Sequence, residues 1–134
     1  MQNTTQEILL TIESELSPAE AVAALELAAA QEGFGVIAVH DVRQTMANKG
    51  VEFPEEVHVV EVCQPHHAAR VLGAKLEVSA ALPCRIGVFS RAGRTHLTMI
   101  RPKAMLGMFH IPEVADVAEE VEVAMTRMLE RART

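Results

Sequence analysis

The chain has 134 residues, of which 49% are hydrophobic, and it carries a formal net charge of −6 at pH 7. This length and apolar content predict one folded domain over residues 1–134 and argue against disorder. The negative charge argues against nucleic acid or an anionic membrane as a partner, because those partners attract cations. The chain has no tryptophan or tyrosine and only four phenylalanines. This scarcity of aromatic rings argues further against single-stranded nucleic acid, whose bases stack on such rings.

The first half of the chain is predicted to alternate strands with helices. The long helix has the clearest start, because Ser17 can cap it, Pro18 suits its first position and Glu20 completes a capping box. Gly33 is the expected stop, since glycine tolerates a left-handed backbone. In chain order the predicted elements are a strand at 7–13, the helix at 18–32, a strand at 34–41, a short helical segment at 43–49 and a strand at 55–62.

The second half is predicted to hold a hairpin between helices. Its elements are a short helix at 65–72, hairpin strands at 85–90 and 95–101, a turn with one helical turn at 102–109 and an amphipathic helix at 113–131. The order β-α-β-β-α-β-β-α mixes hairpins with crossovers. It therefore predicts an α+β fold of two layers, with a mixed, largely antiparallel sheet and helices packed on one face.

The only two cysteines, Cys63 and Cys84, each lie beside a proline in the sequence. Cys63 ends a strand directly before a helix, where unpaired N–H groups and the helix dipole favour a thiolate. With His66 or His67 it could form a nucleophile and base, or two metal ligands that Cys84, His40 or His58 would have to complete. The alternative is that Cys63 packs as a small hydrophobe and the histidines are solvated.

Whether the two cysteines meet depends on strand direction. If the strands ending at Cys63 and starting at Cys84 are parallel, the cysteines lie at opposite ends of the sheet, roughly 20 Å apart. A disulfide is then not expected, unless the 74–82 connection returns the chain to the same end.

The first six residues show no signal peptide and no apolar run reaches the ~20 residues of a membrane span. These features predict a cytoplasmic protein with no membrane partner, in a compartment where stable disulfides are uncommon.

Other side chains could contribute to a binding site. Arg85 could bind a carboxylate or phosphate, or serve as an edge-strand cation that discourages aggregation. His40 could join the site or pair with Asp41. Three methionines allow either soft-metal binding or core packing: Met99, Met105 and Met108. The predicted ligand-binding residues are Cys63, His66, His67, Arg85, Cys84 and His40, with Cys63 as the candidate catalytic group.

Three segments, Gly33-Phe34, Val62-Cys63-Gln64-Pro65 and Leu82-Pro83-Cys84-Arg85-Ile86, resemble the DUF302 family, a bacterial and archaeal domain of undetermined function. The resemblance covers roughly residues 15 to 110 and implies a compact α+β sandwich that forms a homodimer. The family commonly has asparagine where this chain has Gln64. Because glutamine is a poor helix cap, a weak cap is expected beside Cys63.

Three functions remain open at this point. The first is a homodimeric module that binds a small molecule in a cleft near Cys63, His66 and His67. The second is a thiol-dependent redox or sulfur-transfer enzyme that uses Cys63, although the chain has no C-x-x-C, G-x-S-x-G or glycine-rich phosphate motif. The third is a structural or protein-interaction module with an apolar dimer interface. No cofactor and no specific metal is predicted.

Overall fold

The computed structural model describes residues 8–134. The strands are β1 (Leu9–Ser14), β2 (Gly35–Asp41), β3 (Val57–Cys63), β4 (Cys84–Arg91) and β5 (Arg94–Ile100). The α-helices are α2 (Pro18–Gln31), α3 (Val42–Asn48), α4 (Pro65–Ala74), α5 (Pro102–Gly107) and α6 (Ala115–Arg131), with short 3₁₀ helices η1 (Leu76–Ala81) and η2 (Pro112–Val114). The start of the first predicted strand, at Glu7, and the six residues before it lie outside this range.

The five strands form one sheet in the order β1-β5-β4-β3-β2, and neighbouring strands are antiparallel in every described pair. The predicted α+β fold is confirmed. The predicted mixture of parallel and antiparallel strands is not confirmed, because no described pair of strands is parallel. Strands β3 and β4 are antiparallel because α4 and η1 carry the chain back to the end of the sheet where β3 finishes. None of the described helices is long and apolar enough to cross a membrane.

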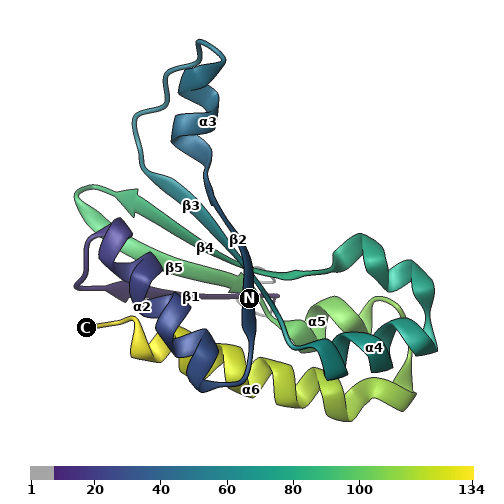
Figure 1. Ribbon diagram of the computed structural model, residues 1–134. Coiled ribbons are helices and arrows are strands. Elements are labelled where there is room, and N and C mark those ends of the chain that lie inside the picture. The colour runs from purple at the N-terminus through teal and green to yellow at the C-terminus, as the bar shows by residue number, and fades with distance from the viewer. Residues whose placement is uncertain (1–7) are drawn as a thin grey trace, which may run out of the picture.

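The helices other than α3 gather on one side of the sheet, with α2 and α6 side by side (Figure 1). Alternate residues of the three central strands face these helices and are at most 2% exposed, namely Val60, Val62, Ile86, Val88, Leu97 and Met99. The opposite alternation places the other residues of these strands on the uncovered side, which we call the open face. The described helices therefore cover one face of the sheet, and no helix of residues 8–134 lies over the open face.

The start of α2 follows its predicted signals closely. The Ser17 hydroxyl accepts a hydrogen bond from the Glu20 amide at 3.2 Å, and the Ser17 amide donates to the Glu20 carboxylate at 2.9 Å. Pro18 occupies the first turn, and Gly33 after the helix has a φ of 78°. The capping box therefore fixes the direction in which α2 crosses the sheet.

Replacing Ser17 by alanine is expected to lower the free energy of unfolding by about 1 kcal/mol, because the cap of α2 is lost. Urea denaturation measures this change. The matched control is Ser79→Ala, since Ser79 is exposed and its hydroxyl makes no hydrogen bond within the described residues. Its effect should stay within about 0.5 kcal/mol. Equal losses in the two variants would contradict the capping role.

One part of the chain projects from this two-layer body. Strand β2 leads into α3, the loop after α3 leads back into β3, and α3 stands apart from the other helices (Figure 1). We call residues 42–56 the arm. Helix α3 has no buried residue, and after it Val51 and Phe53 are 53% and 43% exposed. The arm therefore presents apolar surface that the described chain leaves in contact with solvent.

Candidate functional site

The two cysteines lie at the same end of the sheet. Val62 is opposite Cys84 in the β3–β4 ladder, so Cys63 is one residue beyond that pair. Both are free thiols of intermediate exposure, and both line a cavity of about 40 Å³ that we call the thiol cavity. Its other lining residues include His67 and Met105. Of the two alternatives, the second holds, because β3 and β4 are antiparallel and the 74–82 connection returns the chain to the same end of the sheet.

The environment of Cys84 opposes thiolate chemistry at that residue. Burial raises the pKa of the Cys84 thiol to about 11, and Cys63 shifts it in the same direction while Arg85 opposes the shift. A thiol with this pKa is protonated at neutral pH, and the protonated form is a poor nucleophile. Cys84 is consequently a protonated thiol at neutral pH and not an activated nucleophile.

The two histidines that follow Cys63 in the first turn of α4 have different surroundings. The His67 ring lies 3.5 Å from a carboxylate oxygen of Glu120 and 6.5 Å, centre to centre, from the Phe34 ring. His66 is exposed. Within residues 8–134 neither ring forms a hydrogen bond with the Cys63 sulfur. The nucleophile and base suggested by the C-x-x-H spacing are therefore not paired in this structure.

The backbone beside Cys63 is capped, contrary to expectation. The Gln64 side-chain oxygen accepts a hydrogen bond from the His67 amide at 2.9 Å. The extended backbone of Gln64, with φ −108° and ψ 111°, allows its longer side chain to fold back onto the first turn of α4. The prediction of a weak cap was wrong because it rested on average residue preference, which local geometry overrides here.

On the open face, three neighbouring strands place charged groups together. The Glu61 carboxylate on β3 accepts from Arg85 Nε on β4 at 3.1 Å and contacts His40 Nε2 on β2 at 3.0 Å. These hydrogen bonds, His40 first, hold the pKa of the Glu61 carboxyl below its usual value. His40 therefore pairs with Glu61, while Asp41 instead caps α3 by accepting from the Gln44 amide.

The lowered pKa of Glu61 predicts an acid-sensitive contribution to stability. The ionised carboxylate is favoured in the folded protein, so its contribution is complete above the ordinary pKa of 4.5 and is lost as the pH falls through the lowered value. Urea denaturation from pH 7 to pH 3 should show the difference between wild type and Glu61→Gln shrinking below pH 4.5. Glu26→Gln is the matched control for this chemical change, because Glu26 is an exposed carboxylate with no ion pair within residues 8–134. A difference for Glu61→Gln that does not change with pH would contradict this account.

Beside the charged cluster, the open face carries a groove of about 230 Å³, which we call the sheet groove. Its residues include Leu9, Val59, Arg85, Gly87, Thr98 and Ile100, with Pro83 and Cys84 also in its lining. A Cβ atom added at Gly87 would lie 3.0 Å from Thr98 Cγ2. The floor of the groove thus depends on the missing side chain at Gly87. Cys84 lines both the sheet groove and the thiol cavity.

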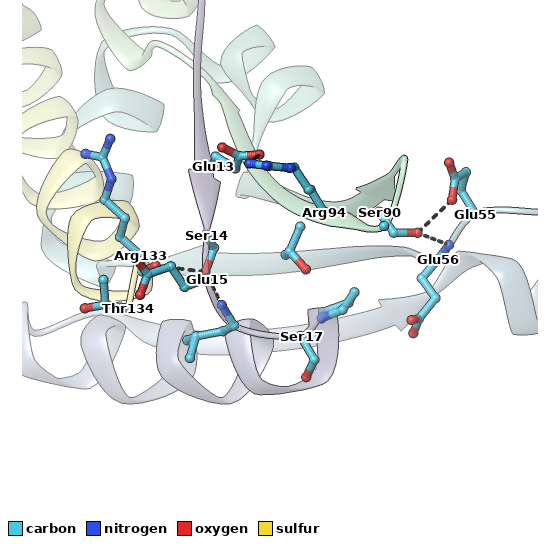
Figure 2. Close-up of a pocket in the computed structure, with 14 residues that line it drawn as sticks. Glu13, Ser14, Glu15, Ser17, Glu55, Glu56, Ser90, Arg94, Arg133 and Thr134 are labelled. Carbon is cyan, nitrogen blue, oxygen red and sulfur yellow. Dashed lines mark hydrogen bonds and ion pairs between the residues drawn. The ribbon is translucent and has the colours of Figure 1, made fainter.

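A larger and more polar depression lies elsewhere, and Figure 2 shows the side chains that line it. It has a volume of about 870 Å³ and is lined by none of the residues predicted from the sequence. Its polar groups bind one another. Arg94 extends to the Glu13 carboxylate at 2.9 Å, and the Ser90 hydroxyl donates to Glu55 at 3.0 Å and accepts from the Glu56 amide at 2.9 Å (Figure 2). The depression therefore has fewer free groups for a ligand than its size suggests.

The structure thus divides the predicted residues into two groups. Cys63, Cys84 and His67 line the thiol cavity, Arg85 and His40 meet at Glu61 on the open face, and His66 joins neither group. The residues predicted from the sequence did not include Glu61 or Gly87. Strand periodicity gives the signal for Glu61, because Glu61 alternates with the buried residues Val60 and Val62 and therefore lies on the open face. Only the ladder register shows that Arg85 is opposite it.

Comparison with known proteins places the chain in a family. The family described as "Domain of unknown function DUF302" matches residues 10–132. The crystal structure titled "uncharacterized conserved protein DUF302 from Bacillus stearothermophilus" is 32% identical with a TM-score of 0.88, and the similarity covers 94% of this chain and 98% of that chain. A search of curated proteins found no match. The chain belongs to the DUF302 family.

Proposed function

We propose that the protein is a binding module for a small carboxylate with an aliphatic body, held in the sheet groove. The observation that carries the proposal is the position of Arg85, a half-exposed guanidinium in the lining of an otherwise largely apolar groove. Ligand sites are typically concave and apolar, with a few polar groups that fix orientation. The groove has this composition, whereas the polar depression of Figure 2 does not.

The state of Arg85 favours a carboxylate as the polar part of the ligand. Its Nε donates to Glu61, which orients the guanidinium, and within the described residues its two terminal nitrogens make no hydrogen bond. Two parallel N–H donors match the two oxygens of a carboxylate. A phosphate is less well matched, because the described residues that line the groove include no second cation to balance its charge.

The volume of the groove limits the size of the ligand. A volume of 230 Å³ accommodates about eight groups of the size of a water molecule, at about 30 Å³ each. Hexanoate has the required carboxylate and a chain of matching length. Its methylenes would lie against Val59, Gly87 and Ile100, where they leave water.

A titration followed by amide NMR tests this proposal. Adding hexanoate to the full chain should shift the Gly87 and Thr98 amides saturably, and 1-hexanol should bind at least about tenfold more weakly because it lacks the carboxylate. Arg85→Gln should remove the preference for hexanoate. The matched control is Arg91→Gln, since Arg91 lies further along β4, outside the groove, with its guanidinium 5.0 Å from the Phe89 ring centre. Equal affinity for acid and alcohol, or no shift at Gly87, would refute the proposal.

Self-association is a second property, favoured by the arm. A seven-residue helix without a buried residue gains little stability from its own hydrogen bonds. Exposed Val51 and Phe53 would be covered if two arms packed against each other around a twofold axis, which buries the same patch on both copies. The module would then be a homodimer with one sheet groove in each subunit.

Sedimentation velocity at micromolar concentration measures this association. Wild type is expected to sediment as a dimer and the variant Val51→Ser/Phe53→Ser as a monomer. Leu76→Ser is the control, because Leu76 is 74% exposed on η1 and its replacement removes an exposed apolar side chain away from the arm. A monomeric wild type, or a dimeric arm variant, would contradict an arm-mediated dimer.

A further inference from the structure

The thiol cavity gathers the softest donor atoms of the chain. Cys63 comes from the end of β3, Cys84 from the start of β4, Met105 from α5 and His67 from the first turn of α4. Elements far apart in the sequence therefore place both cysteines and a methionine in the lining of one small space. This space is distinct from the sheet groove, because the two linings have only Pro83, Cys84 and Met105 in common.

We propose that the thiol cavity is a binding site for a single Cu(I) ion, held by the sulfur atoms of Cys63 and Cys84 with Met105 as a weaker third ligand. The cavity volume of about 40 Å³ is close to that of one water molecule, about 30 Å³. It has room for one ion and not for an organic ligand. Its lining is almost wholly apolar, so a hydrated, hard cation gains nothing by entering.

The donor set selects the metal. Within residues 8–134 no three histidine, cysteine or carboxylate side chains are close enough to share a metal ion. Zinc in structural sites takes four such ligands, so this cavity does not suit it. Thiolate and thioether sulfur favour Cu(I), and two thiolates with one methionine form a sufficient ligand set without a histidine or carboxylate.

The binding step leaves the oxidation state unchanged. Each thiol releases one proton to solvent as its sulfur forms a bond with copper, and no electron is transferred. The positive end of α4, directly after Cys63, favours the negative charge that results.

An anaerobic competition between the reduced full chain and the chromophoric Cu(I) chelator bicinchoninate tests the site. Wild type should retain one Cu(I) per chain. Cys63→Ser and Cys84→Ser should each weaken binding by more than about 100-fold, since losing a direct ligand exceeds the 10–100-fold cost of losing an outer partner. Met105→Leu should weaken it about tenfold. Met108→Leu is the control, because Met108 is 69% exposed and does not line the cavity.

A loss of copper binding must be distinguished from a loss of folding. Circular dichroism of each variant checks that it is folded, and Met105→Leu conserves volume in case a serine variant unfolds. Failure of wild type to retain copper would overturn the proposal. Retention that survives Cys84→Ser would also overturn it, because it would place the metal on Cys63 alone. Arg85→Gln should retain copper while losing its hexanoate preference, so the two proposals can fail separately.

Discussion

Replacing Ile86 by alanine is expected to lower the free energy of unfolding by about 2–5 kcal/mol. Ile86 is fully buried in β4 and lies between Val60 of β3 and Met99 of β5 in the ladders. Its side chain therefore packs between the sheet and the helices that cover it. Removing three carbon atoms loses apolar burial and leaves a cavity that the surrounding strands cannot fully close.

The control for this variant is Ile37→Ala, which makes the same chemical change on β2, where the side chain is 59% exposed. Its cost should not exceed about 1 kcal/mol, the range of strand propensity. Both values come from urea denaturation at one pH. Similar losses at the two positions would contradict the burial of Ile86 and the exposure of Ile37.

Replacing Gly87 by valine is expected to abolish hexanoate binding, because the new side chain occupies the floor of the sheet groove. The added Cβ would lie 3.0 Å from Thr98 Cγ2. The Thr98 and Thr11 hydroxyls form a hydrogen bond of 2.7 Å, which limits the freedom of the Thr98 side chain to rotate away. A modest loss of stability should accompany the loss of binding. Amide NMR titration and urea denaturation measure the two effects separately.

A second substitution distinguishes a filled groove from a damaged sheet. Thr98→Ser removes the Cγ2 atom that the valine would strike and retains a hydroxyl for Thr11. The double variant Gly87→Val/Thr98→Ser should recover stability and still fail to bind hexanoate. If the double variant recovers binding along with stability, the groove floor is not where the ligand lies.

Local signals predicted the elements well because their causes are local. The capping box at Ser17 and Glu20 and the left-handed backbone at Gly33 fix both ends of α2 within one residue of expectation. The regular apolar stripe of the last helix and the turn glycine Gly93 likewise marked α6 and the β4–β5 hairpin. Neither feature needs knowledge of the rest of the chain.

Strand direction could not be predicted in the same way. Whether Cys63 and Cys84 share an end of the sheet depends on the path of α4 and η1, and that path involves the packing of α4 against α6 and of η1 against α4. The charged cluster depends on the register that places Arg85 opposite Glu61. Long-range pairing therefore decided both parts of the candidate site.

Some of the site residues predicted from the sequence line the cavities of the structure. Cys63 and Cys84 do meet at one cavity, and Arg85 does face the open side of the sheet. Gly87 was not among the predicted site residues, because its contribution to the groove is the absence of a side chain. That absence matters only once the sheet register shows that Val59 and Thr98 flank Gly87. A glycine in a strand gains meaning from its neighbours in the sheet.

The most direct measurement is a crystal structure of the full chain grown with hexanoate. The carboxylate is predicted to lie within hydrogen-bond distance of the terminal nitrogens of Arg85, with the aliphatic chain running over Gly87 in the sheet groove. An empty groove at saturating hexanoate, or hexanoate bound instead in the polar depression of Figure 2, would contradict the proposed function.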